Sequence, residues 1–396
     1  MTAAGEASIL VLNVGSSTLK FGLYPLVERD DALLQGALEH TGPTTGQLRL
    51  TDSTGHSESR ELVVNRDSAA AAVLHYLKAE SRFASIQSVG HRLVHGGSKL
   101  REPVRIDANV RALLEGIIPL APDHLPGELR AIDEVARLAP LLEQVVCFDT
   151  AFHSELPIVA RIFGLPRRLS DSGVVRYGFH GLSYEYVTEE LRSRGELRPR
   201  TIVAHLGNGA SIAALLDGVS IDTSMGMTPS GGLVMSTRSG DLDPGVVLYL
   251  LRSRGFSVSG LDDVTNREGG MLGISETSSD LRDLLAASAT DSRAQDAIDV
   301  FCYQAKKFIG AYAAALGGID ALVFTGGIGE HSPEVRARIC DKLDFLGIRI
   351  DPVLNGANAS KISAADGGVV IRTVRTREEV MIARHVRKSL AGAAIP

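Results

Sequence analysis

The chain has 396 residues, of which 44% are hydrophobic and 22% are charged. This length exceeds one ordinary domain and is typical of two, and the composition is that of a folded protein, not a disordered one. The 41 Lys and Arg against 47 Asp and Glu give a net charge of −6, which argues against a broad nucleic-acid surface. We therefore expect a two-domain protein that binds small ligands.

The cysteines and the N-terminus give no sign of secretion. Cys147, Cys302 and Cys340 are odd in number, far apart and without C-x-x-C spacing, which favours neither a disulfide framework nor a zinc site. Residues 1–8 lack the basic and apolar regions of a signal peptide, and no run of about 18 apolar residues occurs. We expect a cytoplasmic protein with no membrane or nucleic-acid partner.

Two segments share the same plan of strand, small-residue turn and strand. Residues 8–14 are apolar and β-branched, residues 15–17 break the pattern, and residues 19–24 resume it. The plan recurs with residues 201–206, the turn 207–209 and residues 210–216. Alternating apolar runs around such turns predict hairpins, and two of them indicate a duplicated architecture.

A third strand and two helices are expected towards the C-terminus. Residues 321–325 run into a Gly-rich turn at 326–329, and a helix should follow with Ser332 as N-cap and Pro333 in its first turn. Apolar residues at steps of three and four from Ile298 to Leu316 predict a long amphipathic helix. Polar stretches at about 41–58 and 355–370 are expected to be surface loops.

The small-residue turns at 15–18, 207–209 and 326–329 all follow apolar strands. Without a Cβ, backbone N–H groups can approach phosphate oxygens closely, so three such turns indicate a nucleotide, although glycine in a single turn is usually structural. The chain has no P-loop motif and no G-x-G-x-x-G that opens a helix, which excludes the common mononucleotide and dinucleotide motifs.

Charged side chains beside glycine and serine are candidates for chemistry. Arg92 and Arg238 lie in Gly/Ser-rich segments, where a guanidinium can fork onto a carboxylate or a phosphoryl group; a surface ion pair is the alternative. Asp149 follows an apolar run, as a carboxylate at a strand end would. His180 lies between an aromatic residue and glycine, with a structural role as the alternative, and Glu378 either binds Mg²⁺ or complements a helix dipole.

Seven motifs, spread over essentially the whole chain, resemble those of the acetate kinase family in their order. They are NVGSSTLKF (13–21), HRLVHGG (91–97), FDTAFH (148–153), RYGFHG (176–181), HLGNGAS (205–211), TRSGDLDP (237–244) and FTGGIGE (324–330).

The family belongs to the actin, sugar-kinase and chaperone-ATPase superfamily, so the resemblance implies an α/β fold of two RNase H-like domains with the active site in a cleft between them. Domain I would comprise residues 1–150, closed by a C-terminal helix in 376–396. Domain II, residues 151–375, would bind nucleotide and carry most of a homodimer interface.

The activity implied is reversible, Mg²⁺-dependent phosphoryl transfer between ATP and acetate, giving acetyl phosphate and ADP by direct in-line transfer and feeding acetyl-CoA formation. Mn²⁺ would substitute for Mg²⁺. One alternative is a kinase for propionate or another short-chain acyl group. A second is a non-catalytic nucleotide-binding regulator, against which the joint presence of the charged candidates argues, because a regulator has no use for the whole set.

By the same resemblance, each matching residue receives a role. Asn13 and Glu378 would hold the metal, and Asp149 would be the essential carboxylate, which we interpret as an orienting or metal-linked group more than a proton acceptor. The catalytic set would further comprise Arg92, Arg238 and His180. The acyl pocket would be formed by Arg92, Val94, Phe179 and Pro229. The nucleotide would contact Ser16, Thr18, Lys20, His205, Leu206, Gly207, Asn208, Gly209, Asp280, Leu281, Arg282, Gly326, Gly327, Ile328, Gly329 and Glu330.

One departure from the family pattern bears on acyl selectivity. Asp123 occupies the position of an apolar pocket residue, and an ionised carboxylate against a methyl group would be costly. Because Pro122 and Pro126 stiffen this loop, we expect Asp123 to be turned away from the acyl site or paired, for example with His124. The choice between acetate and propionate stays open at this point.

Overall fold

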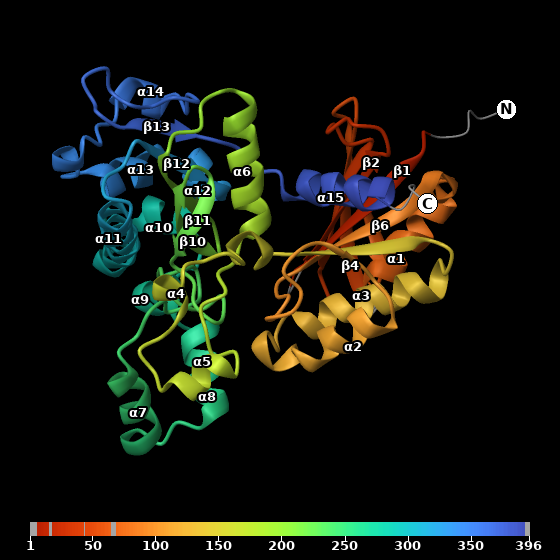
Figure 1. The fold of residues 1–396 in the computed structure, drawn as a ribbon, viewed down its shortest axis with the longest axis horizontal. Coiled ribbons are helices and arrows are strands. Elements are labelled where there is room, and N and C mark those ends of the chain that lie inside the picture. The colour runs from red at the N-terminus through yellow and green to blue at the C-terminus, as the bar shows by residue number, and fades with distance from the viewer. Residues whose placement is uncertain (1–5, 16–17, 43, 65–68, 393–396) are drawn as a thin grey trace. The chain divides into compact units, whose positions relative to one another are not determined.

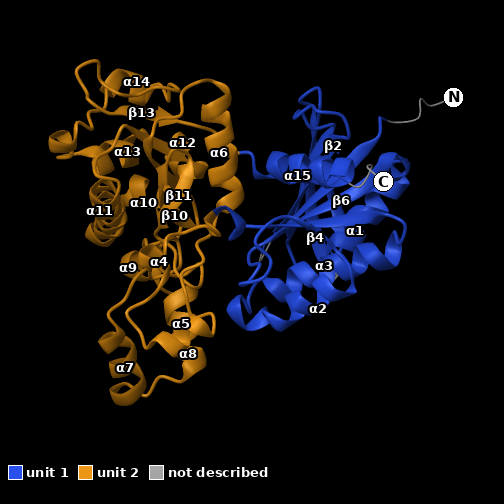
Figure 2. Ribbon diagram, viewed as in Figure 1, with its two compact units in different colours: residues 1–152, 377–396 blue, residues 153–376 orange. Residues whose placement is uncertain are grey.

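The computed structural model describes residues 6–15, 18–42, 44–64 and 69–392 of the chain. The chain divides into two compact units, one formed by residues 1–152 and 377–396 and the other by residues 153–376 (Figure 2). Each unit contains one sheet covered by helices (Figure 1). Within the described residues, none of the helices combines the length and the apolar character needed to span a membrane.

Unit 1 contains an eight-stranded sheet in the order β5-β4-β3-β2-β1-β6-β8-β7. Strand β1 is antiparallel to β2 and parallel to β6, and β6 is parallel to β8. The strands are β1 (Ser8–Val14), β2 (Thr18–Pro25), β3 (Leu34–His40), β4 (Thr45–Asp52), β5 (Ser57–Val63), β6 (Ile86–Leu93), β7 (Val104–Arg105) and β8 (Glu143–Phe148).

Helices cover both faces of this sheet. Side chains of β1 alternate, so that Leu10 and Leu12 pack in a core with α1 (Ala69–Ala79) and α3 (Leu125–Leu138), while α2 (Ala108–Gly116) packs on α3. The opposite face carries α15 (Glu378–Gly392). Gly90 of β6 permits its close approach, because a Cβ there would lie 2.5 Å from Ile382 Cγ2.

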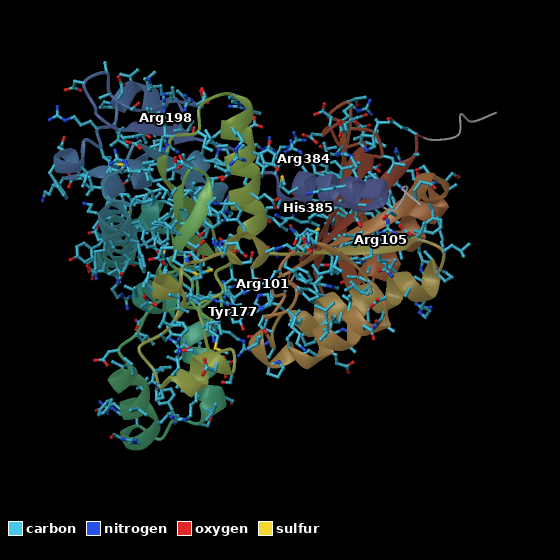
Figure 3. All side chains as sticks on the ribbon, viewed as in Figure 1. Arg101, Arg105, Tyr177, Arg198, Arg384 and His385 are labelled. Atoms are coloured by element: carbon cyan, nitrogen blue, oxygen red, sulfur yellow. The ribbon has the colours of Figure 1, made fainter. Side chains whose placement is uncertain are left out.

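Arginines attach α15 to the rest of unit 1, among them Arg105 and Arg384, which Figure 3 labels, and Arg387, which donates to the Pro25 carbonyl. Arg105 of β7 donates to the Ser389 carbonyl at 2.7 Å, and Arg384 on α15 forms an ion pair with Asp30. The C-terminal helix is therefore held at both its middle and its far end, which fixes the position of its first residue, Glu378.

Unit 2 contains a five-stranded sheet in the order β11-β10-β9-β12-β13. Strand β9 is antiparallel to β10 and parallel to β12, and β12 is parallel to β13. The strands are β9 (Arg200–Leu206), β10 (Ala210–Leu216), β11 (Val219–Thr223), β12 (Ala321–Thr325) and β13 (Val370–Thr373). This order and these directions repeat those of β3-β2-β1-β6-β8 in unit 1, which confirms the duplicated α/β architecture.

The longest helix of unit 2, α11 (Ser292–Ala315), packs against β9 and β10 and against α9, α10 and α13. The other helices are α4 (Ile158–Arg161), α5 (Arg167–Asp171), α6 (Gly181–Ser193), α7 (Pro244–Ser253), α8 (Val258–Asn266), α9 (Gly270–Ser275), α10 (Leu281–Ala287), α12 (Gly326–His331), α13 (Pro333–Cys340) and α14 (Pro352–Gly356).

Most of the expected elements are present. Both hairpins form, α11 follows the predicted apolar stripe, and Ser332 caps α13 by accepting a hydrogen bond from the Val335 N–H. Two expectations are wrong. The stretch 41–58 contains β4 and the start of β5, because Leu48 and Leu50 alternate inward despite polar neighbours. The expected turn at 326–329 is itself the first part of α12.

Candidate active site

The carboxyl ends of three neighbouring strands of unit 1 bring Asn13, Arg92 and Asp149 together. Asn13 on β1 lies opposite Arg92 on β6, and Asp149 follows β8 directly. Arg92 binds the Asp149 carboxylate through two nitrogens, at 3.0 and 2.5 Å, and its Nη1 donates to Asn13 Oδ1 at 3.1 Å. The Asp149 side chain is only 1% exposed and that of Arg92 is 17% exposed, so this bidentate pair is partly buried, and it fixes the orientation of the guanidinium.

Glu378 joins this cluster from the first turn of α15. Burial raises the pKa of Glu378 to about 7, an effect that Arg92 opposes and Asp149 reinforces. Burial also acts to lower the pKa of Arg92, but Asp149 and Glu378 outweigh it and hold that pKa above its usual value. Arg92 is therefore a permanent cation among carboxylates.

The oxygen donors near Arg92 decide which kind of magnesium site this region can form. Among the described residues, no group of three or more His, Cys, Asp or Glu side chains is arranged as a metal site. Mg²⁺ commonly takes only one or two carboxylates and completes its shell with waters and substrate phosphates. Oxygens of Asn13, Asp149 and Glu378 beside one Arg fit that mode of binding, and they fit a closed structural site poorly.

Glu128 is part of the same region and was missed from the sequence. It lies in the first turn of α3, is 1% exposed, and both of its carboxylate oxygens accept from the Val94 N–H at 3.2 Å. Burial raises the pKa of Glu128 to about 8, while Arg92 acts to lower it. An acidic residue in a first helical turn looks like an ordinary dipole-complementing residue, so no local signal distinguished it.

His180 is held in unit 2 by a network of hydroxyl groups. It precedes α6 with a left-handed backbone (φ 59°), and its Nδ1 lies 2.9 Å from Ser211 Oγ, which also contacts the Tyr184 hydroxyl. The ring stacks on His205, with centroids 4.2 Å apart, and His205 Nδ1 contacts Ser183 Oγ at 2.7 Å. The contact of Nδ1 with Ser211 and the stacking on His205 together fix the orientation of the His180 ring.

Arg238 and His180 converge above Gly209, in the turn between β9 and β10. A Cβ at Gly209 would lie 3.2 Å from His180 Nε2 and 3.5 Å from Arg238 Nη1. Arg238 Nη1 also donates to the Pro229 carbonyl at 3.2 Å. Gly270, which the sequence analysis missed, is equally necessary: its φ is 65°, and a Cβ there would lie 2.8 Å from the Arg238 backbone nitrogen.

The remaining nucleotide candidates divide between the two units. Thr18 and Lys20 lie on β2 of unit 1, where Lys20 is opposite Asn13, and Ser16 lies outside the described residues. In unit 2, Gly326 packs on the end of β9, since a Cβ there would lie 2.6 Å from the Leu206 carbonyl oxygen. The segment Gly207, Asn208 and Gly209 is therefore close to the start of α12, which contains Gly326, Gly327, Ile328, Gly329 and Glu330.

Three candidates lie around α10. Asp280 caps this helix by accepting from the Arg282 N–H at 2.8 Å, and it also pairs with the exposed Arg282 guanidinium. Leu281 is buried, as is Leu206 at the end of β9. These two leucines can therefore offer a ligand little more than backbone atoms.

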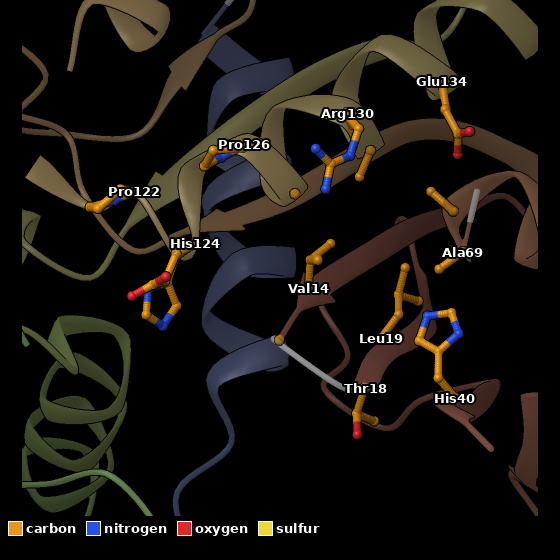
Figure 4. Close-up of a pocket in the computed structure, with 15 residues that line it drawn as sticks. Val14, Thr18, Leu19, His40, Ala69, Pro122, His124, Pro126, Arg130 and Glu134 are labelled. Atoms are coloured by element: carbon orange, nitrogen blue, oxygen red, sulfur yellow. The ribbon is translucent and has the colours of Figure 1, made fainter. Parts of the chain in front are cut away.

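The acyl-pocket candidates are also divided, with Val94 in unit 1 and Phe179 and Pro229 in unit 2. Asp123 is exposed and lines a cavity of about 350 Å³ in unit 1, together with Val14, Thr18 and residues at the start of α3 (Figure 4). Neither Val94 nor Arg92 lines that cavity. Asp123 therefore lines a space from which Val94, a buried residue, is absent.

Comparison with known proteins shows which proteins the chain is similar to. The family model described as the acetokinase family matches residues 8–384. An acetate kinase of Rhodopseudomonas palustris is 43% identical over 388 residues, which cover 96% of this chain and 97% of that one. An acetate kinase of Thermosynechococcus vestitus is 41% identical, over 95% of this chain and 97% of its own.

Solved structures give the same result. The crystal structure of Porphyromonas gingivalis acetate kinase matches with a TM-score of 0.87 and 40% identity, covering 97% of this chain and 100% of that one. A propionate kinase from Francisella tularensis matches with a TM-score of 0.90 and 36% identity, covering 96% and 98%. The chain belongs to the acetokinase family.

Proposed function

We propose that this protein is an acetate kinase, which transfers a phosphoryl group reversibly between ATP and acetate. The observation that carries the proposal is the paired cluster of Arg92, Asp149 and Asn13 in unit 1, together with His180 and Arg238 above Gly209 in unit 2. We propose that both clusters act on the same phosphoryl group, and that the reaction takes place in the cytoplasm.

The chemistry places modest demands on the protein. A carboxylate acceptor is already ionised at neutral pH, so no strong base is needed. Phosphoryl transfer mainly requires alignment and neutralisation of the charge on the equatorial oxygens. Arg92 and Arg238 would supply that charge, and His180 would donate a hydrogen bond to the transferring group. Bound Mg²⁺, near Asn13 and Glu378, would offset phosphate charge.

Asp149 has an orienting role in this proposal. Its bidentate pairing holds the Arg92 guanidinium in one plane, and its burial is tolerable because Arg92 is a permanent cation beside it. A proton acceptor would instead need a free lone pair facing the nucleophile. The pairing therefore supports orientation over general base catalysis for Asp149.

A propionate kinase is the second candidate. One structural relative with a TM-score of 0.90 is a propionate kinase. Only the residues that contact the acyl group would determine whether acetate or propionate is preferred. A missing methylene in an apolar pocket is worth about 1–3 kcal/mol, so the preference has to be measured with both acids in parallel.

We also propose that the protein is a homodimer that associates through unit 2. None of the residues of α7 is buried, although six consecutive positions, 246–251, are apolar. Val246, Leu248 and Tyr249 are between 43% and 50% exposed. A helix this apolar and this exposed is typical of a surface covered by a partner, and a second copy of the chain is the partner that we propose.

The first prediction concerns the two arginines. Arg92→Ala and Arg238→Ala should each lower kcat by about two orders of magnitude or more, because each removes charge stabilisation of the transferring phosphoryl. Formation of acetyl phosphate, trapped as the hydroxamate, measures this. Circular dichroism should show folded proteins, and the surface variants Arg49→Ala and Arg194→Ala serve as controls. Near-normal kcat in a folded Arg92 or Arg238 variant would refute the proposed chemistry.

The second prediction concerns the metal. Activity should disappear with EDTA and return with Mg²⁺ or Mn²⁺, and Glu378→Gln should raise the Mg²⁺ concentration needed for half-maximal rate, because one anionic ligand is lost. A titration of rate against Mg²⁺ measures this, with Glu115→Gln on α2 as the control. Transfer that proceeds without divalent metal would contradict the proposal.

The third prediction concerns Asp123. If it is turned away from the acyl site, Asp123→Leu should keep the KM for acetate within about threefold and leave the acetate-to-propionate ratio of kcat/KM nearly unchanged. Val94→Ala, in contrast, should shift that ratio towards propionate by enlarging the pocket. A fall of about tenfold or more in the acetate KM of Asp123→Leu would show that Asp123 lines the pocket.

The fourth prediction concerns assembly. The purified protein should have the mass of a dimer by light scattering at micromolar concentration, and Leu248→Glu should convert it to a monomer, because a charge would be buried in an apolar interface. Val63→Glu changes a more exposed valine of unit 1 and should leave the dimer intact. A monomeric wild-type protein, or a dimeric Leu248→Glu variant, would exclude α7 from the interface.

A further inference from the structure

Arg336 is a buried cation with no anionic partner among the described residues. It lies on α13 with no exposed surface. Its guanidinium donates to the carbonyl oxygens of Gly329 (2.8 Å), Glu330 (3.0 Å) and Asn355 (3.0 Å), and to the side-chain oxygens of Asn355 (2.8 Å) and Asn358 (2.7 Å). Every one of these acceptors is neutral.

Burial of the Arg336 charge without an anionic partner in the described part of the chain lowers the stability of the folded protein. Removing a charge from water without a counter-charge costs several kcal/mol, and burial lowers the pKa of Arg336. The hydrogen bonds offset part of that cost, since bonds from a charged donor are strong. Together, these hydrogen bonds connect the C-terminal carbonyls of α12 with Asn355 on α14 and with Asn358, which follows α14.

The helix that Arg336 holds is unstable by itself. Three of the six residues of α12 are glycine, each costing roughly 1 kcal/mol in a helix relative to alanine, and so short a helix does not form alone. Its other end is also held, because Glu330 Oε1 accepts from the N–H groups of Gly326 (3.1 Å) and Thr376 (3.0 Å). Hydrogen bonds made by the side chains of Glu330 and Arg336, in addition to the backbone hydrogen bonds of α12, therefore determine the shape of this helix.

We propose that Arg336 is a positioning residue that holds α12 in the conformation required for nucleotide before the nucleotide binds. This inference rests on the proposed role of Gly326 to Glu330 in nucleotide binding. A prearranged helix spares the ligand the cost of ordering it. Arginine suits this task better than lysine, because its planar fork presents five donors in fixed directions, and Arg336 uses them on acceptors from three segments.

The experiment compares Arg336→Ala and Arg336→Lys with Arg338→Ala. Arg338 lies on the same helix but forms exposed ion pairs with Glu334 and Asp299. Calorimetric titration with ADP should show a dissociation constant about tenfold higher or more in both Arg336 variants, and within about twofold of wild type in Arg338→Ala. The KM for ATP should rise in parallel, with the KM for acetate within about threefold.

Two further measurements separate positioning from a general loss of structure. Hydrogen exchange in the absence of nucleotide should accelerate in residues 326–331 of the Arg336 variants and stay unchanged in α11 and β9. Adding guanidinium to Arg336→Ala should restore part of the ADP affinity, whereas it should not affect Arg338→Ala. If Arg336→Ala does not fold, Arg336→Lys provides the same comparison of exchange and affinity.

The outcomes are distinguishable. A wild-type protein that does not bind ADP would refute the proposed function, and the exchange of residues 326–331 would still report whether Arg336 holds α12. Normal ADP affinity and normal exchange in a folded Arg336 variant would overturn the inference while leaving the proposed function intact. Uniform acceleration of exchange throughout unit 2 would also overturn it, because Arg336 would then be a general stabilising residue.

Discussion

The ion pair between Arg92 and the buried Asp149 is the constraint on which unit 1 depends. Its two residues lie at the ends of β6 and β8, and a buried charge is tolerable only while its partner stays in place. The strands must therefore keep their register, and α15 must deliver Glu378 beside them. Gly90 and the arginines that attach α15 contribute to the same requirement, because they fix how closely and where this helix packs.

The duplication gives the two units matching positions for different tasks. In unit 1, the described functional candidates lie at the end of β1, on the first part of β2 and at the ends of β6 and β8. In unit 2, the equivalent places are the β9–β10 turn with Gly209 and the end of β12 with α12. Parallel strands bring their carboxyl ends to one edge of a sheet, where ligands bind in open α/β folds. At these equivalent positions, the same topology presents charged side chains in unit 1 and mainly glycine backbone in unit 2, where Arg238 and His180 come from other segments.

The sequence predicted the hairpins, the third strand and the charged residues at strand ends, because those features depend on local alternation and turn chemistry. It did not predict Glu128, Gly270 or Arg336. Each of these matters through partners distant in the chain or through a close backbone approach, which leaves no periodicity to detect. The wrong prediction of a loop at 41–58 has a related cause. Strands at the edge of a sheet carry many polar residues, so their sequences resemble those of loops. The interdomain cleft stays a prediction.

The helix α12 shows why tertiary contacts override local preference at such a site. Gly326 has a φ of 77° and allows no Cβ against the Leu206 carbonyl, so the residue that permits close packing also weakens the helix that it begins. Any residue with a Cβ at position 326 would clash with the Leu206 carbonyl. The helix propensity of this position therefore cannot be raised by substitution. The stabilisation has to come from side-chain hydrogen bonds, through the carboxylate of the helix's own Glu330 at one end and the guanidinium of Arg336 on α13 at the other. Sequence rules based on neighbouring residues then predict a turn, whereas the distant contacts produce a helix.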